Sequence, residues 1–162
     1  MVIFGKRLSD YAAFCRVFLI LIAILGITRL ALSLGGTPNS TAKWLSMTAA
    51  VWIGIVYYSV RVHTSGFGSY KQLLPVVALL NITAQVIAII GIAIAMSTGN
   101  DNIFSAPEYA FGGNGKSWLH LGAHVFIGTT IGSLLPWVIG CGFLAATKKL
   151  TRSNQKILRS ES

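Results

Sequence analysis

WLHLGAHVFIGTTIGSLLPWVIGCGFLAAT, residues 118–147, contains two histidines near its start and no Asp, Glu, Lys or Arg. A transmembrane α-helix needs about 20 consecutive, mostly apolar residues, and this segment exceeds that length. It is also too long and too apolar to be a surface helix of a soluble domain, which would show a polar face. The segment therefore predicts a membrane-spanning helix.

The whole chain has the composition of a polytopic membrane protein. Of its 162 residues, 54% are hydrophobic and 10% are charged, whereas charged residues make up about a quarter of a typical soluble domain. The mean hydropathy of +0.69 indicates the same class. The formal net charge of +9 comes from 13 Lys and Arg against 4 Asp and Glu. On so apolar a chain it indicates membrane orientation and contact with anionic lipid, and not nucleic-acid binding.

Three further apolar segments resemble the first in length and composition. The earliest is longer than the apolar region of a signal peptide, so it is predicted to be retained as a span. The chain is therefore predicted to be all-α, with a four-helix transmembrane domain over 1–147 and a basic tail over 148–162. The predicted spans are 11–34, 44–62, 72–97 and 118–147.

Positive charge gathers on one side of the predicted bundle. The opposite side carries Asp101 and Glu108 and only two lysines, Lys43 and Lys116. Because Lys and Arg are enriched on the cytoplasmic side, both termini are predicted to be cytoplasmic, in a bacterial inner (plasma) membrane. The basic residues on the predicted cytoplasmic side are Lys6, Arg7, Arg16, Arg61, Lys71, Lys148, Lys149, Arg152, Lys156 and Arg159.

The connector 98–117 joins the third and fourth spans on the predicted outer side. It is too long for a turn, and it contains Phe104, Pro107, Tyr109 and Phe111. Long loops rich in such residues usually pack against their own domain. We expect an ordered outer loop that caps the helix ends and brings Glu108 toward His120.

His120 and His124 are four residues apart and so lie on one helix face. Ionisable side chains inside a membrane are costly, which makes this pair the first candidate for function. The spacing is that of zinc proteases, but the Glu of H-E-x-x-H is absent. A metal would need further ligands from Glu108 or Asp101, giving a His/carboxylate site suited to zinc or another divalent ion.

Two other interpretations of the histidine pair remain open. One histidine, with a ligand from elsewhere, would suit a haem or chlorin, and either would suit contact with a quinone. Two histidines on adjacent turns cannot supply both axial ligands of one haem. The favoured interpretation is structural, with both rings hydrogen-bonded to neighbouring helices or to the loop.

Three further polar residues lie within the predicted spans. Asn81 and Gln85 form a second pair four residues apart, either lining a path for an ion or small solute or, as we favour, bonding helices together. Arg29 is close to the outer end of the first span. It would bind an anionic group, pair with Glu108 or, as favoured here, extend outward to the membrane surface.

The fourth span also contains small residues and a proline. Gly128 and Gly132 form a small-xxx-small step that permits close approach of another helix. Pro136 cannot donate to the carbonyl of Gly132, so a bend is expected there. The bend is either a hinge for gating or, as favoured, a static kink.

Nucleophilic triads, phosphate-binding loops, C-x-x-C pairs and paired intramembrane carboxylates are all missing from the sequence. Three classes of function remain. The first is a binding module or subunit of a membrane assembly, in a homo-oligomer or larger complex. The second is an oligomeric transporter or channel using the amide pair, Arg29 and Pro136. The third is a metal- or cofactor-dependent enzyme using His120, His124 and Glu108. We rank them in this order, so an enzyme is not favoured.

Overall fold

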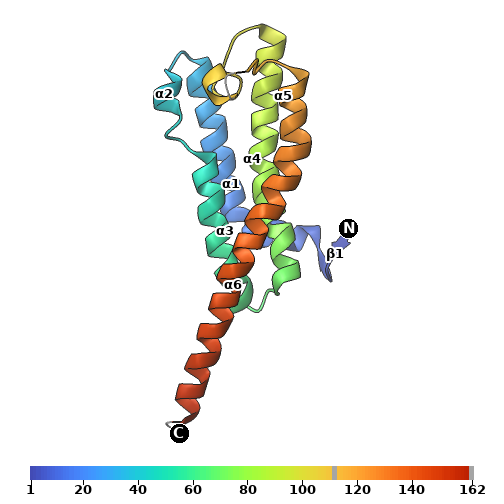
Figure 1. The fold of residues 1–162 in the computed structure, drawn as a ribbon, viewed down its shortest axis with the longest axis vertical. Coiled ribbons are helices and arrows are strands. Elements are labelled where there is room, and N and C mark those ends of the chain that lie inside the picture. Colours follow the sequence, from blue (N-terminus) through green and yellow to red (C-terminus); the bar gives the residue numbers. More distant parts are fainter. Residues whose placement is uncertain (111–112, 161–162) are drawn as a thin grey trace.

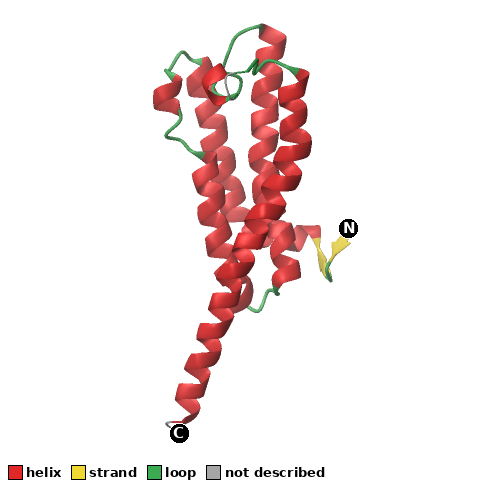
Figure 2. Cartoon of the chain, in the orientation of Figure 1, coloured by secondary structure: helices red, strands yellow, loops and turns green. Residues whose placement is uncertain are grey.

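The computed structural model describes residues 1–110 and 113–160, and they form an all-α bundle (Figures 1 and 2). Four helical stretches are long and apolar enough to cross a membrane, which confirms the predicted fold class. They are α1 (Leu8–Leu34), the stretch Asn39–Thr64 that contains α3 (Met47–Thr64), α4 (Tyr70–Thr98) and a fourth stretch, whose candidate span is Trp118–Ser153. The fourth stretch is made of α5 (Trp118–Ala123), the π-helical η2 (His124–Gly128) and α6 (Thr129–Ser160).

Short elements occupy the two ends of the bundle. We call the end that carries the α4–α5 loop the cap end and the opposite end the hairpin end. The hairpin end has a two-stranded antiparallel hairpin, in which Val2 pairs with Arg7. The short elements are β1 (Val2–Ile3), β2 (Lys6–Arg7), α2 (Asn39–Ala42) and the 3-10 turn η1 (Pro107–Tyr109).

Serine side chains begin three of the helices. The Ser46 hydroxyl accepts the Ala49 N–H at 3.1 Å, and the Ser117 hydroxyl accepts the His120 N–H at 3.2 Å. At Ser69 a capping box forms, in which the Gln72 side chain returns to the Ser69 N–H at 2.9 Å. These bonds satisfy N–H groups that have no partner in the first turn of a helix.

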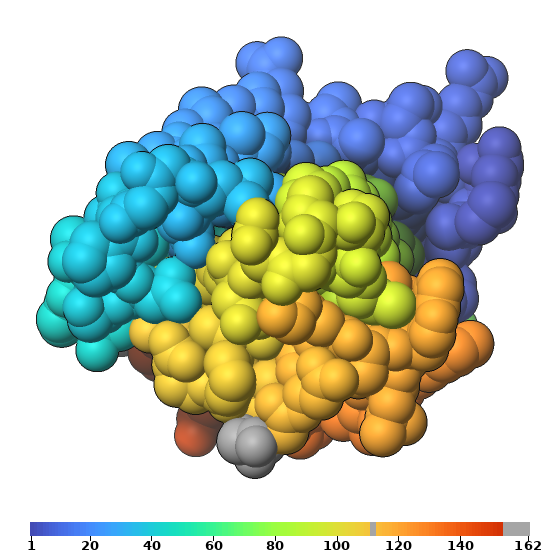
Figure 3. Space-filling model, turned by 90° about the horizontal axis from the view of Figure 1, so that it is seen from above, coloured from blue at the N-terminus to red at the C-terminus, as the bar shows by residue number. Residues whose placement is uncertain are grey.

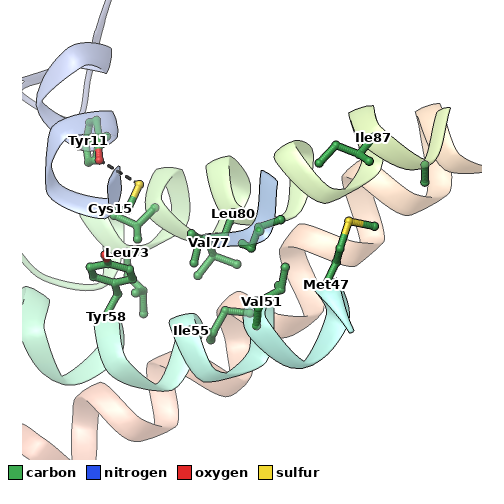
Figure 4. Close-up of a cluster of buried hydrophobic side chains, with 14 of the residues drawn as sticks. Tyr11, Cys15, Met47, Val51, Ile55, Tyr58, Leu73, Val77, Leu80 and Ile87 are labelled. Carbon is green, nitrogen blue, oxygen red and sulfur yellow. Dashed lines mark hydrogen bonds between the residues drawn. The ribbon is translucent and has the colours of Figure 1, made fainter. Parts of the chain in front are cut away.

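Helices α3 and α4 each pack against the three other long helices of the bundle, and the α4 contacts with α1 and α6 are the most extensive. The buried face of α4 joins that of α3 in an apolar core that runs along the bundle (Figure 4). Large apolar side chains on the outside of α1 and α6 are exposed, as expected of a surface that faces lipid. Core residues that Figure 4 labels are Tyr11, Cys15, Met47, Val51, Ile55, Tyr58, Leu73, Val77, Leu80 and Ile87.

The α4–α5 loop packs over the cap end, between α2 and α5 (Figure 3). Asn102 is 1% exposed and donates to the Gly91 carbonyl at 2.7 Å. The Ile103 N–H donates to the Ser33 hydroxyl at 2.9 Å, and the Tyr109 hydroxyl donates to the Asn39 carbonyl at 3.3 Å. The loop is therefore bonded to α4, α1 and α2. Phe111, expected in this cap, lies outside the described residues.

The fourth stretch does not end where the predicted span ends. Helix α6 continues past Thr147 to Ser160 and extends well beyond the bundle at the hairpin end (Figure 1). No glycine or proline interrupts it after Thr147, so nothing local stops the helix. The backbone of the predicted tail is thus one helix with the span, as far as the described residues go; residues 161 and 162 lie outside them.

We predict that Asn102→Ala loosens the cap. The substitution removes the bond to the Gly91 carbonyl and the bond that Asn102 Oδ1 accepts from the Phe104 N–H at 2.9 Å. A loss of about 1–3 kcal/mol in the free energy of unfolding is expected. Unfolding in a nonionic detergent and the rate of protease cleavage in the loop measure it. Asn100→Ala, at an exposed position of the same loop, is the control; equal effects of the two would contradict the assignment.

Candidate functional site

The two histidines lie together where α5 passes into the π-helical turn. Ser117 starts α5 three residues before His120, and η2 begins at His124. The centroids of the two imidazole rings are 5.0 Å apart, with 42° between the ring planes. Both side chains are half-buried. The expected common face is therefore present.

The π-helical turn His124–Gly128 was not expected from the sequence. A π turn widens the helix by one residue and is frequently found at functional sites. The Thr129 hydroxyl bonds to the Val125 carbonyl within this turn. The turn also presents the Gly128 carbonyl to α4, where the Asn81 side-chain amide donates to it at 2.8 Å. No residue pattern in the fourth segment signals such a turn.

A row of polar side chains connects His124 to the middle of the bundle. His124 Nδ1 lies 2.6 Å from Gln85 Oε1, and Gln85 Nε2 lies 3.4 Å from Asn81 Oδ1. Asn81 Nδ2 in turn lies 3.1 Å from Ser133 Oγ. Because a side-chain amide oxygen only accepts, His124 Nδ1 carries the proton in this bond. The amide pair thus bonds α4 to the fourth stretch, as the favoured interpretation predicts.

Gly128 and Gly132 lie directly against this row. A Cβ atom on Gly128 would be 2.8 Å from Gln85 Oε1, and one on Gly132 would be 3.1 Å from Asn81 Nδ2. The small-xxx-small step therefore accommodates the two amides and not an apolar helix surface. Pro136 lies one turn further on, inside α6, which continues through it.

The two carboxylates expected beside the histidines bond elsewhere. Glu108 is exposed and accepts from Asn39 Nδ2 at 3.3 Å, on the α2 side of the cap. Asp101 forms an ion pair with Lys116 at 3.3 Å. Within residues 1–110 and 113–160, no group of three His, Cys, Asp or Glu residues is placed to hold a metal ion. His120 Nε2 is buried, without a hydrogen-bond partner in the described part of the chain.

The guanidinium of Arg29 packs against aromatic rings of the cap. Its guanidinium carbon lies 5.3 Å from the centroid of the Phe104 ring and 5.9 Å from that of Tyr109. Arg29 Nε is buried and has no hydrogen-bond partner among the described residues. The sequence did not predict these ring contacts, because it did not show which residues the cap brings to Arg29; extension to the membrane surface stays a prediction.

Arg29 lines a cavity of about 220 Å³ that also reaches the histidine site. Gln85 and His124 line the same cavity from α4 and η2, while Phe104 and Tyr109 line it from the cap. We call it the arginine cavity. The sequence did not predict that Arg29 and His124 would line one cavity, since they are far apart in the chain and meet through α4 and the loop. The remaining lining residues are Met47, Thr48, Ala84, Ala88 and Ile103.

The carboxylates of the chain leave Arg29 without an acidic partner in the described structure. The sequence contains 4 acidic residues. Asp10 accepts the Arg7 N–H at 2.8 Å, and Asp101 and Glu108 are engaged as described above. The fourth, Glu161, lies outside the described residues. The expected alternative of an Arg29–Glu108 pair is thus not what the structure shows.

Comparisons of the chain with protein-family models, with curated proteins and with solved structures found no match. The site is therefore interpreted from its own geometry.

We predict that Asn81 and Ser133 are energetically coupled across the bundle. In a double-mutant cycle of Asn81→Ala and Ser133→Ala, a coupling of about 0.5–1.5 kcal/mol is expected, the range found for hydrogen bonds between transmembrane helices. Unfolding in mixed micelles measures it. Thr83→Ala paired with Ser133→Ala is the control, because the Thr83 hydroxyl bonds within its own helix, to Leu79 at 2.8 Å. A cycle without coupling would refute the contribution of the Asn81–Ser133 bond.

Proposed function

We propose that this protein is a small integral membrane binding module that holds an anionic ligand in the arginine cavity. The observation that carries the proposal is Arg29, a half-buried cation inside a candidate membrane span. It lines a cavity, and its buried Nε has no hydrogen-bond partner among the described residues. Charged side chains within a membrane are rare and usually mark ligand or ion sites.

The surroundings of Arg29 satisfy its charge only in part. Two aromatic rings at 5.3 and 5.9 Å attract the guanidinium, a contribution of about 0.5–2 kcal/mol each. The faces of these rings do not accept the N–H groups that point outward in the plane of the guanidinium. A carboxylate or phosphate matches the guanidinium fork with two parallel hydrogen bonds. An anion in the cavity would supply what the rings do not.

The other lining groups suit the same kind of ligand. The Gln85 amide has a second N–H that can donate to an anion, besides the one that bonds to Asn81, and His124 holds this amide in place through its Nδ1–H. Together with Arg29, they give a site with one fixed positive charge and adaptable polar neighbours. Such a site binds and orients a ligand without requiring any covalent chemistry.

The two other classes of function have less support. A transport path along the amides is opposed by the bonds that Asn81 makes to Gly128 and Ser133 at 2.8 and 3.1 Å, which hold it between helices. A zinc enzyme at the histidine pair needs a third ligand, and Glu108 and Asp101 are bonded elsewhere. A haem or quinone at His120 or His124 stays a sequence-based hypothesis.

We also propose that the hairpin end faces the cytoplasm and contacts anionic lipid. Two surface cavities there, of about 600 and 400 Å³, are lined by basic side chains. Lys148 and Arg152 line both, and His63 lines the smaller one. Basic residues beside a membrane attract anionic headgroups by about 1 kcal/mol each. Assembly into a homo-oligomer or larger complex remains part of the proposal, and molecular mass in mild detergent measures it.

We predict that small anions stabilise the protein through Arg29. Inorganic phosphate or butanoate, compared with chloride at constant ionic strength, is expected to raise the unfolding temperature in nonionic detergent. Saturation at 100 times the dissociation constant would add about 2.7 kcal/mol. Arg29→Met is expected to weaken the affinity for the anion at least about tenfold, because a charge-assisted hydrogen bond is lost. At the same anion concentration, the stabilisation would then fall to about 1.4 kcal/mol or less. Arg29→Lys keeps the charge but not the two parallel N–H groups, so its affinity for the anion should lie between those of the unaltered protein and of Arg29→Met.

The matched control is Arg16→Met, at an exposed position of the same helix. Its response to phosphate and butanoate should equal that of the unaltered protein. If Arg29→Met lowers the stability without anion but keeps the full response, Arg29 has only a structural role and the proposal fails.

The proposed orientation is tested by labelling single cysteines in a background in which Cys15 and Cys141 are replaced by alanine. Asn100→Cys, at the cap end, is expected to react with a membrane-impermeant maleimide in intact cells whose outer membrane has been permeabilised. Ser153→Cys, beyond the bundle on α6, should react only in inverted inner-membrane vesicles. The opposite pattern would reverse the topology.

A further inference from the structure

A second cavity adjoins the arginine cavity along α4. Its volume is about 260 Å³, and it shares Thr48, Ala84 and Gln85 with the arginine cavity as lining residues. Its other walls are mostly apolar, so we call it the apolar cavity. These walls come from α3, α4 and α6: Val51, Trp52, Asn81, Ile131, Gly132, Leu135 and Pro136.

The apolar cavity opens at the lipid-facing surface of the bundle. Trp52 on α3 is 37% exposed, and Ile131 and Leu135 on α6 are 56% and 58% exposed, although all three line the cavity. Closer to the hairpin end α6 packs against α3, where a Cβ on Gly140 would lie 2.8 Å from the Ser59 hydroxyl. The opening is therefore a slot between α3 and α6, and it lies nearer the cap end than the Gly140–Ser59 contact.

The two cavities together match one molecule with a charged head and an apolar chain. The charged end lies at Arg29 under the cap, and the apolar end lies toward Pro136 and opens to lipid. At about 30 Å³ for a group the size of a water molecule, the apolar cavity holds roughly nine such groups. That space suits one alkyl chain and not two.

We propose that the ligand of the arginine cavity is a single-chain anionic amphiphile, with a carboxylate or phosphate head at Arg29 and its chain in the apolar cavity, entering sideways from the bilayer. The inference rests on the binding function proposed above and adds the ligand class and the route. The bilayer dissolves the chain and so concentrates the molecule at the slot. Buried cap residues, such as Ile103 and Phe104, close the end of the bundle on the other side.

Photolabelling in phosphatidylcholine vesicles tests the proposal. The probes are palmitate with a mid-chain diazirine, hexadecyl phosphate with the same diazirine, and the matching uncharged hexadecanol. Labelled peptides are identified by mass spectrometry. We expect labelling by an anionic probe to concentrate at 48–52 and 131–136, about tenfold above the alcohol, since the charge-assisted bonds to Arg29 are missing for the alcohol. The stronger anionic probe identifies the head, and competition by added phosphate or butanoate shows that the head shares the small-anion site.

Substitutions separate this inference from the function on which it rests. Arg29→Met should reduce labelling by the anionic probe about tenfold, whereas Arg16→Met should not change it. Ile131→Trp narrows the slot without lining the arginine cavity. It should reduce labelling several-fold and keep the stabilisation by butanoate and phosphate.

Three results would overturn the inference. These are equal labelling by the acid and alcohol probes, labelling spread over all lipid-facing helices, and labelling that is insensitive to both Arg29→Met and Ile131→Trp. If small anions still stabilise the protein through Arg29 in that case, the ligand is a small water-soluble anion and only the amphiphile is refuted. If they do not, the binding function itself is refuted.

Discussion

The structure depends on one constraint: a polar group buried in lipid finds no water, so its hydrogen-bonding partner must come from the protein. Asn81 shows how the constraint is met. It is buried between α4 and the fourth stretch, and it donates to the Gly128 carbonyl and to Ser133. Its oxygen accepts from Gln85, which in turn bonds to His124. One continuous row of hydrogen bonds therefore satisfies these polar side chains of α4 and of the fourth stretch.

The same constraint explains why the glycines of the fourth stretch occur where they do. Two helices approach closely only where side chains are small. A Cβ on Gly128 or Gly132 would occupy the space of the Gln85 and Asn81 amides. Without this space the amides would have to turn toward lipid, at a cost of several kcal/mol for each unsatisfied group. Packing and hydrogen bonding are therefore not separable along this interface.

The sequence predicted the fold well and the site only in part. Long apolar segments with few charges define spans because length and composition alone decide membrane insertion, and the four helical stretches agree. The amide pair and the glycine step were also recognisable, since their spacing puts them on one helix face. The π-helical turn was not, because it arises from contacts between α4 and the fourth stretch that no local pattern encodes.

The contacts of the side chains in the α4–α5 loop could not be predicted from the sequence either. Glu108 was expected near His120, but Pro107 to Tyr109 form a 3-10 turn that directs the carboxylate to Asn39. The same turn brings Tyr109 to Arg29, so one local conformation decides both outcomes. A tertiary contact of this kind depends on the path of the whole loop. The sequence therefore indicated which residues to consider but not which of them lie together.

Arg29 is an exception to the rule that a buried polar group bonds within the protein, and this makes it informative about function. An arginine that served only the fold would be bonded like Asn81 or would reach the membrane surface, because either arrangement lowers its energy. Among the described residues, Arg29 Nε has no hydrogen-bond partner, although the guanidinium lies beside two aromatic rings and a row of bonded polar groups. The cap that supplies the rings also forms one wall of the arginine cavity. The rings satisfy the cation in part, and an anion would add the hydrogen bonds that the described residues do not supply, which is why we propose binding and not a purely structural role.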